Sequence, residues 1–421
     1  MFSLFKANCS KSDNVFYTIN SLLIALLLSL LVVGDASLIR NLLGVVTLLY
    51  IILYFKKIDF FESSHRFWII AIALFGAYHL LHILLLGDPL EHFGNYYKYL
   101  IIAAFVMYLS KVGFWLPSLY LGTAIGCVLT LYMGVNEAIS TPSHYRIGIG
   151  HNPIVLATLL LVYIVVLIEA IFEKNHYLIK IVAGILVFGM IYLIVNTGVR
   201  GAYLTLLCLT CIYLCRLVLQ FNAKTRLYSL LTFILISGLV LFFAAQSPSV
   251  EKRYERTLVE LQHISQGDFT TSIGLRLNAW HVASAMIKEK PLFGYGEARA
   301  EIIEASHEIS EQYDIEMNSV ATLSHIHSQF LQIWVEYGIF GLACLLFVYV
   351  SFMSGLNTHD RWMFIAVLVI FLVLSLTDSG FKNNILVTAF FVVGSVLRVY
   401  KEKSIALSYD RVSSKKEPCQ N

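Results

Sequence analysis

Two histidines separated by one residue, His325 and His327, are the side chains of this sequence best suited to acid–base chemistry. They stand where a long polar segment, 247–326, meets an apolar one. The unperturbed pKa of imidazole lies closest to neutrality among the side chains, which makes histidine the usual proton carrier. A second interpretation stays open, in which both are interfacial side chains hydrogen-bonded to nearby backbone.

Three arginines, Arg146, Arg200 and Arg276, are the candidate anion-binding residues. Arg200 lies between two apolar runs with almost no loop around it, and a guanidinium at membrane depth costs roughly 2.5–3.5 kcal/mol unless it faces a cavity or an anion. The arginine fork binds phosphate oxygens in pairs. Each arginine alone could be an interfacial anchor. Together with the histidine pair, the three favour a site for a polyanion.

Common catalytic and metal-binding motifs are missing from the sequence. It contains no Asp-x-Asp pair, P-loop, Gly-x-Ser-x-Gly or His-Glu-x-x-His. Cys208, Cys211 and Cys215 follow helical spacing without a neighbouring histidine or carboxylate, so we expect them to pack and not to bind metal. We therefore expect no metal and no cofactor. Arginines that hold phosphate and a histidine that moves a proton fit transfer from a lipid-diphosphate donor to a hydroxyl.

The composition predicts a membrane protein. Of 421 residues, 58% are hydrophobic and 14% are charged, with a mean hydropathy of +0.74, whereas a soluble domain carries roughly 25% charged residues. We expect an all-α polytopic membrane protein with about 12 transmembrane helices of about 20 residues each. The apolar runs that qualify are 17–34, 38–55, 67–86, 97–112, 114–135, 153–172, 178–196, 202–220, 228–246, 328–354, 362–378 and 383–399.

Basic residues concentrate in alternate connections between these runs, and positive charge accumulates on the cytoplasmic side. Both termini are therefore expected in the cytoplasm and the long polar segment outside. The expected division is nine transmembrane helices in 1–246, an outer loop with two or more helices in 247–326, three transmembrane helices in 327–399 and a cytoplasmic tail, 400–421.

The outer loop carries helical patterns of its own. Pro291, Gly294 and Gly296 predict a turn between two loop helices. Acidic residues then recur at intervals of four and three, as one stripe on a helix that either faces water or touches a partner. The members of this stripe are Glu297, Glu301, Glu304, Glu308 and Glu311.

Family-level motifs run in order along the second half of the chain. Arg200-Gly201 follows an apolar run, and Arg276-x-x-x-Trp280 leads to Pro291-Leu292-Phe293-Gly294-Tyr295-Gly296. His325-Ile326-His327-Ser328 comes next, followed by Glu336-Tyr337-Gly338-Ile339-Phe340-Gly341-Leu342. This order resembles the O-antigen ligase and polymerase family. The His-x-His step, the expected layout and the loop size are most similar to the O-antigen ligases of Gram-negative inner membranes.

The resemblance implies a GT-C-like glycosyltransferase of the bacterial inner membrane, with a metal-independent, inverting reaction on the periplasmic face. The donor would be O-antigen linked to undecaprenyl diphosphate and the acceptor a sugar of the lipid A–core; membrane lipids surround the protein, and no nucleic acid is involved. By position, Arg200 and Arg276 would hold the diphosphate, His327 would be the general base, and His325 would support it. Arg146 is added from its chemistry. The common Asn after the second His is Ser328 here, which weakens the assignment of a ligand at that position although Ser still donates and accepts hydrogen bonds.

Other functions remain open. The polymerase branch of the family, or another lipid-linked oligosaccharide ligase, would use the same donor chemistry on a different acceptor. A transporter or flippase tends to show related halves and broken helices near the midplane, and the sequence has no internal repeat. A purely structural scaffold would leave the arginines and the histidine pair unexplained.

Overall fold

The structure of the protein is a computed structural model. It describes residues 11–34, 36–54, 65–86, 93–141, 146–173, 176–220, 227, 238, 248–297, 299–312, 325–354 and 361–399.

These residues form helices, turns and short connections, and no strand occurs among them. The helices are α1 (Lys11–Leu30), α2 (Ala36–Tyr54), α3 (Arg66–Leu86), α4 (Phe93–Val112), α5 (Pro117–Ser140), α6 (Pro153–Phe172), α7 (Tyr177–Thr197), α8 (Arg200–Gln220), α10 (Pro248–Ser265), α11 (Ser272–Glu289), α12 (Arg299–Gln312), α13 (Gln329–Phe352), α14 (Arg361–Thr377), the 3₁₀ turn η3 (Gly380–Lys382), α15 (Asn384–Val387) and the π-helical segment η4 (Thr388–Val393).

The protein is an all-helical, multi-pass membrane protein. Seven of the described helices are long and apolar enough to cross a membrane: α2, α3, α5, α6, α7, α8 and α13. Shorter apolar helices occur at Asn14–Leu30, Arg361–Thr377 and Asn384–Val399. The expected run 228–246 and the expected tail 400–421 lie outside the described residues, so the number of twelve spans stays a prediction.

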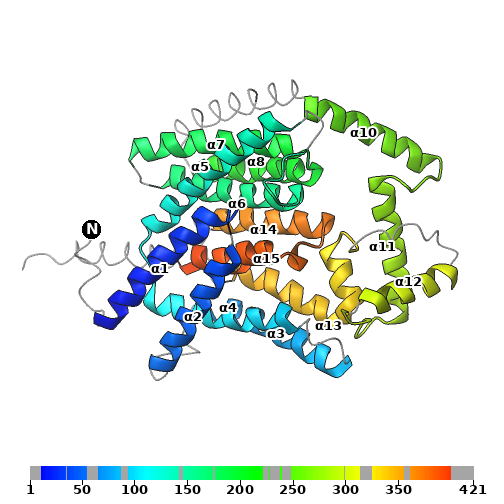
Figure 1. Cartoon of the computed structure of the whole chain (residues 1–421), viewed down its shortest axis with the longest axis horizontal. Helices are drawn as coiled ribbons and strands as arrows, with labels where there is room; N and C mark the ends of the chain where they lie inside the picture. Colours follow the sequence, from blue (N-terminus) through cyan, green and yellow to red (C-terminus); the bar gives the residue numbers. More distant parts are fainter. Residues whose placement is uncertain are drawn as a thin grey trace, which may run out of the picture.

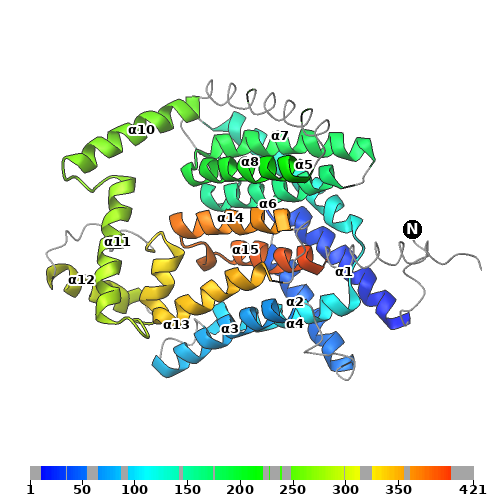
Figure 2. The same ribbon diagram turned by 180° about the vertical axis from the view of Figure 1, so that it is seen from behind.

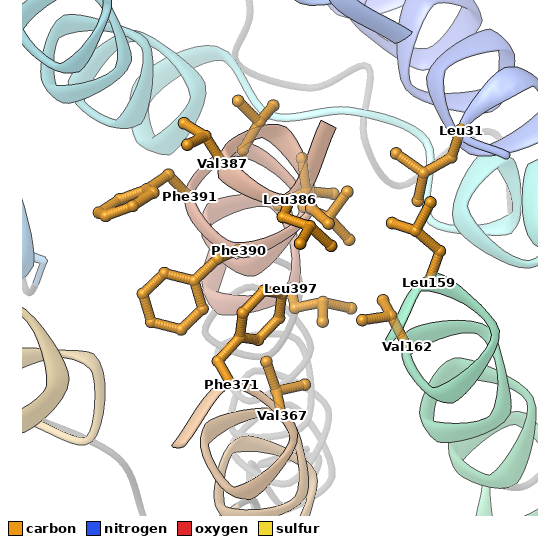
Figure 3. Close-up of a cluster of buried hydrophobic side chains, with 14 of the residues drawn as sticks. Leu31, Leu159, Val162, Val367, Phe371, Leu386, Val387, Phe390, Phe391 and Leu397 are labelled. Carbon is orange, nitrogen blue, oxygen red and sulfur yellow. The ribbon is translucent and has the colours of Figure 1, made fainter. Parts of the chain in front are cut away.

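Helix α6 lies at the centre of the bundle. It is apolar on all sides and buried along nearly its whole length, from Val155 to Ala170, as expected for a helix surrounded by other helices. It packs against α5, α7, α8 and α14. Figure 3 shows Val162 of α6 near Leu397 and Leu159 of α6 near Leu31, with Phe371 of α14 beside Phe390 of η4.

Helices α10, α11 and α12 lie together at one end of the bundle (Figures 1 and 2). Helix α11 begins after Thr271, whose hydroxyl accepts a hydrogen bond from the N–H of Gly274 (3.3 Å), a normal N-terminal cap. Val282 and Met286 of α11 pack with Ile302 and Ile309 of α12 in a second apolar cluster that also includes Val335 of α13. The loop helices are thus tied to the start of a membrane helix.

Helix α13 is broken at Gly338, whose φ of +65° is not helical. The predicted turn after Pro291 packs into this break. The N–H groups of Tyr295 and Gly296 donate to the carbonyls of Val335 and Glu336, at 2.8 and 2.9 Å. Backbone groups that the broken helix leaves without partners are satisfied by the loop, and the loop is fixed in register against α13.

Candidate active site

His325 and His327 converge on one carboxylate, that of Asp378. The Nε2 atom of His325 lies 2.7 Å from Oδ1 of Asp378, and Nδ1 of His327 lies 3.0 Å from the same oxygen. The two imidazole ring centres are 4.2 Å apart. Asp378 directly follows α14, so the site joins the start of α13 to the end of α14.

The hydrogen bonds to Asp378 define which nitrogen of His327 can act as a base. Oδ1 of Asp378 also accepts from the N–H of Ser379 (2.8 Å). Burial raises the pKa of Asp378, but the hydrogen bonds from His325 and His327 outweigh it and hold this pKa well below its usual range. An ionised carboxylate only accepts, so Nδ1 of His327 carries a proton, and in the neutral form of the ring Nε2 carries the lone pair. Nε2 has no hydrogen-bond partner among the described residues, and the side chain keeps 16% of its surface exposed.

The backbone holds His327 in an uncommon conformation. Its φ is +55°, one of only two positive values at non-glycine positions in the described part of the chain. Both backbone polar groups of the preceding residue, Ile326, are fixed by hydrogen bonds. The N–H of Ile326 donates to Oε1 of Gln332 (2.8 Å), and its carbonyl accepts from the indole of Trp280 (3.0 Å). A strained residue fixed by its surroundings is common at functional sites.

Arg200 begins α8 beside this site. Gly198, with a φ of +61°, ends α7 and makes the tight corner between α7 and α8. Gly201 packs on α14, where a Cβ at this position would lie 3.3 Å from Oγ1 of Thr377, the neighbour of Asp378. Gly198 therefore allows the corner between α7 and α8, and Gly201 allows the close contact between α8 and α14. This contact places Arg200 close to Asp378.

The guanidinium of Arg200 pairs with Glu260 of α10. Nη1 lies 2.8 Å from Oε2 and Nη2 lies 3.1 Å from Oε1, a bidentate arrangement. The side chains are 27% and 13% exposed. The fork of Arg200 is thus held by a carboxylate, whose two oxygens accept the paired N–H groups as two oxygens of a phosphate can.

Arg276 and Arg146 both lie within electrostatic reach of Arg200, and Arg146 also lies within reach of Arg276. Burial lowers the pKa of Arg276, Asp378 raises it, Arg200 lowers it and Glu260 raises it. Burial likewise lowers the pKa of Arg146, with further lowering by Arg276 and Arg200. Neighbouring cations repel one another and so lower one another's pKa. An anion placed among them relieves this repulsion.

These two arginines also have donors to spare. Nε of Arg146 donates to the carbonyl of Thr197 (2.8 Å), which anchors the side chain on the α7–α8 corner. Arg276 donates no hydrogen bond to any described residue. Of the residues selected from the sequence, His325 and His327 thus contact Asp378, Arg276 lies within electrostatic reach of Asp378, and Arg146 and Arg200 lie within electrostatic reach of Arg276.

A buried polar cluster lies beside the site. Nζ of Lys382 pairs with Glu297 (2.9 Å) and with Glu336 (2.8 Å), and the hydroxyl of Tyr337 donates to Glu297 (3.0 Å). Burial lowers the pKa of Lys382, but Glu336 and Glu297 outweigh it and leave this pKa raised. The lysine is therefore a permanent cation that joins the loop to α13.

Glu297 differs from its predicted place in the acidic stripe. It precedes α12 and is buried, whereas Glu304, Glu308 and Glu311 are exposed on α12. The regular spacing predicted a shared face, but residues share a helical face only within one helix, and α12 begins at Arg299. The side chain of Glu301 lies outside the described part of the structure.

His325, His327 and Asp378 also have the composition of a metal-binding set, with one ligand atom from each within 4.8 Å of the others. Each ring nitrogen that faces Oδ1 of Asp378 can either donate a hydrogen bond to it as an N–H group or offer a lone pair to a metal, and the two uses exclude each other.

Asp378, Glu260 and Lys382 were not selected from the sequence. Asp378 ends an apolar run, 362–378, and a lone acidic residue at that position is the only signal that could have selected it. Glu260 is one of several charges in α10, so nothing in the sequence marks it.

Part of the amino-acid sequence matches a known protein family. Residues 185–346 match the family model described as O-Antigen ligase. Over this segment the chain is similar to the O-antigen ligase family. It contains Arg200, Arg276, His325 and His327, while Asp378 lies beyond its end. The resemblance seen in the sequence is confirmed at the level of the family.

Individual relatives match the chain over most of its length or over about a third of it. An uncharacterized protein of Haemophilus influenzae is 24% identical over 364 residues, 83% of this chain and 88% of that protein. Two proteins each named "Putative polysaccharide ligase", from Rickettsia conorii and Rickettsia prowazekii, are 32% and 31% identical over 142 residues. That match spans 32% of this chain and 32% of each Rickettsia protein.

Proposed function

We propose that the protein is a glycosyltransferase that moves a polysaccharide from a lipid diphosphate to a hydroxyl of an acceptor glycolipid. In the specific form implied by the family, it transfers O-antigen from undecaprenyl diphosphate to lipid A–core on the periplasmic face of the inner membrane. The observation that carries the proposal is a histidine base, His327, hydrogen-bonded to Asp378, with Arg276 within electrostatic reach of that carboxylate. Arg200 and Arg146 lie within electrostatic reach of Arg276.

His327 would act as the general base. Its Nε2 lone pair takes the proton of the acceptor hydroxyl as the oxygen attacks the anomeric carbon of the donor sugar. The bond between that carbon and the diphosphate oxygen breaks, and the electron pair leaves with the diphosphate. Attack from the face opposite the leaving group inverts the anomeric centre. General-base help of this kind contributes typically 10²–10⁴-fold in rate.

The arginines would stabilise the departing diphosphate. Arg276 and the Nη groups of Arg146 have unused donors, and Arg200 already holds a planar anion, Glu260. Charge grows on the leaving oxygen in the transition state, and donors placed there in advance lower the barrier. No metal is needed for this, because the arginines supply the positive charge that a divalent ion supplies elsewhere.

The direct test is transfer by the purified full chain, with lipid-linked polysaccharide and acceptor glycolipid, with and without a chelator. We expect transfer in both conditions and a loss of at least about 10²-fold in His327→Ala. His281→Ala is the matched control, because His281 is an exposed histidine on α11. Transfer by His327→Ala at the wild-type rate, or transfer abolished by the chelator, would overturn the proposal.

The same assay separates the two branches of the family. A ligase product carries the polysaccharide on the acceptor glycolipid. A polymerase product is a longer chain that remains on the lipid diphosphate, so product analysis by mass distinguishes the two.

A further inference from the structure

A buried glutamine of α13, Gln332, contacts both segments that carry the candidate catalytic groups. Its Oε1 atom accepts a hydrogen bond from the N–H of Ile326 (2.8 Å), the residue before His327. The same oxygen accepts from the hydroxyl of Ser379 (3.4 Å), whose N–H donates to Asp378. Gln332 is 4% exposed, so it can act on a substrate only through the side chains that it holds.

The amide of Gln332 has one orientation in this setting. Its Nε2 atom donates to Oε1 of Glu336 (2.7 Å), one turn further along α13, and this oxygen also accepts from Nζ of Lys382 (2.8 Å). An ammonium has donors only, so Oε1 of Glu336 is an acceptor, and the amide nitrogen of Gln332 has to face it. The hydrogen-bond partners of a glutamine decide which way its amide points. Its oxygen is therefore left for the N–H of Ile326.

A second glutamine holds the other segment against the same helix. Gln329, one turn before Gln332 and 1% exposed, accepts a hydrogen bond from the N–H of Phe381 (2.8 Å) in η3. The histidine segment is thus held by Gln332, and the segment after α14 is held by both glutamines. The first two turns of α13 therefore set the distance between His327 and Asp378.

His327 needs such support because its backbone is strained. Its φ of +55° is uncommon for a residue with a side chain, and such a conformation persists only where the surroundings fix it. We infer that Gln332 is a positioning residue: the hydrogen bonds of its amide set where the imidazole of His327 stands against Asp378. The inference rests on the proposed function, in which His327 is the base. A group displaced by about 1 Å can cost roughly 10²-fold in rate.

Two variants separate this role from simple filling of the interior. Gln332→Met keeps the approximate length and volume of the side chain and removes its hydrogen bonds. Gln332→Glu combined with Glu336→Gln exchanges the amide and the carboxylate. The exchange keeps the total charge, an acceptor for the N–H of Ile326, an N–H between the two exchanged side chains and an acceptor for Lys382. Should Gln332→Met not fold, Gln332→Glu alone takes its place, since it keeps the acceptor and loses the donor.

Transfer by the purified full chain is measured as kcat and donor KM. We expect kcat to fall by about 10²-fold in Gln332→Met, with the donor KM within about threefold of wild type, because the displaced base acts on the chemical step. The exchange variant should recover kcat to within about tenfold of wild type. Gln312→Met, at the exposed glutamine that ends α12, is the matched control and should match wild type. A wild-type kcat in Gln332→Met, or an exchange variant as slow as Gln332→Met, would overturn the inference.

The protonation of His327 gives a second reading that does not depend on transfer. ¹⁵N NMR of histidine-labelled protein in detergent, at about pH 8 where imidazole is neutral, reports which nitrogen carries the proton, and His327→Ala identifies the signal. We expect the form protonated on Nδ1 in wild type and in the exchange variant, and a mixture of both forms in Gln332→Met. Identical tautomers in Gln332→Met and wild type contradict the inference. A wild type that does not transfer contradicts the proposed function and leaves this reading valid.

Discussion

Asp378 sets the chemistry of the candidate site at the scale of single residues. One of its oxygens accepts hydrogen bonds from His325, His327 and the Ser379 backbone. In the proposed mechanism, the carboxylate would fix the tautomer of His327 and stabilise the imidazolium that forms when Nε2 takes a proton, as the aspartate does in a catalytic triad. The histidines were selected from the sequence because of their type and spacing. Asp378 is 51 residues from His327, and only the packing of α14 on α13 and α8 brings it there.

Replacing Asp378 by Asn tests this orienting role. The amide keeps the size of the side chain but can donate to Nδ1 of His327, which favours the wrong tautomer. We expect transfer to fall by roughly 10²–10⁴-fold while the variant remains folded in detergent. Asp378→Glu should recover part of the activity, because it restores an acceptor. An Asn variant that transfers at the wild-type rate would show that His327 does not depend on Asp378.

The low pKa of Asp378 gives a stability prediction with a defined sign. A carboxylate whose folded pKa is depressed stabilises the fold above its unfolded pKa of about 3.9, and this stabilisation is lost as pH falls through the folded pKa. The difference in thermal midpoint between wild type and Asp378→Asn should therefore be at least as large at about pH 5 as at about pH 7. It should shrink below about pH 4. A difference that disappears between neutral pH and about pH 5 would contradict the depressed pKa.

At the scale of elements, the break in α13 positions the loop helices. A Cβ on Gly338 would lie 2.0 Å from the carbonyl oxygen of Leu292, and one on Gly294 would lie 2.5 Å from that of Val335. Both glycines have positive φ, so both chain geometry and close approach require glycine here. The turn at 291–296 and the motif at 336–342 in α13, which are separate in the sequence, thus form the two sides of one contact.

Gly338→Ala should separate the turn at 291–296 from α13. Because α11 carries Arg276 and packs on α12 and α13, a displacement of about 1 Å would disturb the site, and we expect transfer to fall by about 10²-fold. Limited proteolysis of the α10–α12 segment should become faster. Gly184→Ala on α7 is the matched control, since a Cβ there meets nothing within 4 Å. Gly294→Ala should reproduce the effect of Gly338→Ala; if only one of the two does, the shared contact is not its cause.

At the scale of the whole molecule, the apolar runs predicted the helices well because the membrane imposes their length and composition. The run 153–172 coincides with α6, and 202–220 lies within α8. The polar connections were less predictable, because their residues are placed by contacts between distant segments. Glu260 on Arg200 and Lys382 between Glu297 and Glu336 join parts of the chain 46 to 85 residues apart, which no local pattern records.

A second buried ion pair holds the bundle at the end of α6 and α8 remote from Arg200. Arg216 pairs with Glu169, the two side chains are 5% and 3% exposed, and the guanidinium lies 4.2 Å from the ring centre of Phe172. Removing one partner of such a pair leaves an uncompensated buried charge and costs roughly 3–5 kcal/mol. We therefore expect Glu169→Gln to lower the thermal midpoint strongly, whereas Glu255→Gln, an exposed carboxylate on α10, should change it little.

The double variant Glu169→Leu with Arg216→Leu removes both charges. It therefore measures the net contribution of the ion pair to stability, apart from the penalty of leaving one buried charge unpaired. Apolar residues of similar volume suit an interior between membrane helices, and replacing a buried pair in this way is often neutral or stabilising. The double variant should therefore recover most of the midpoint lost in Glu169→Gln. Because the pair lies far along α8 from Arg200, transfer by the double variant should stay close to wild type. A double variant as unstable as Glu169→Gln would mean that the pair supplies net stabilisation to the contact between α6 and α8.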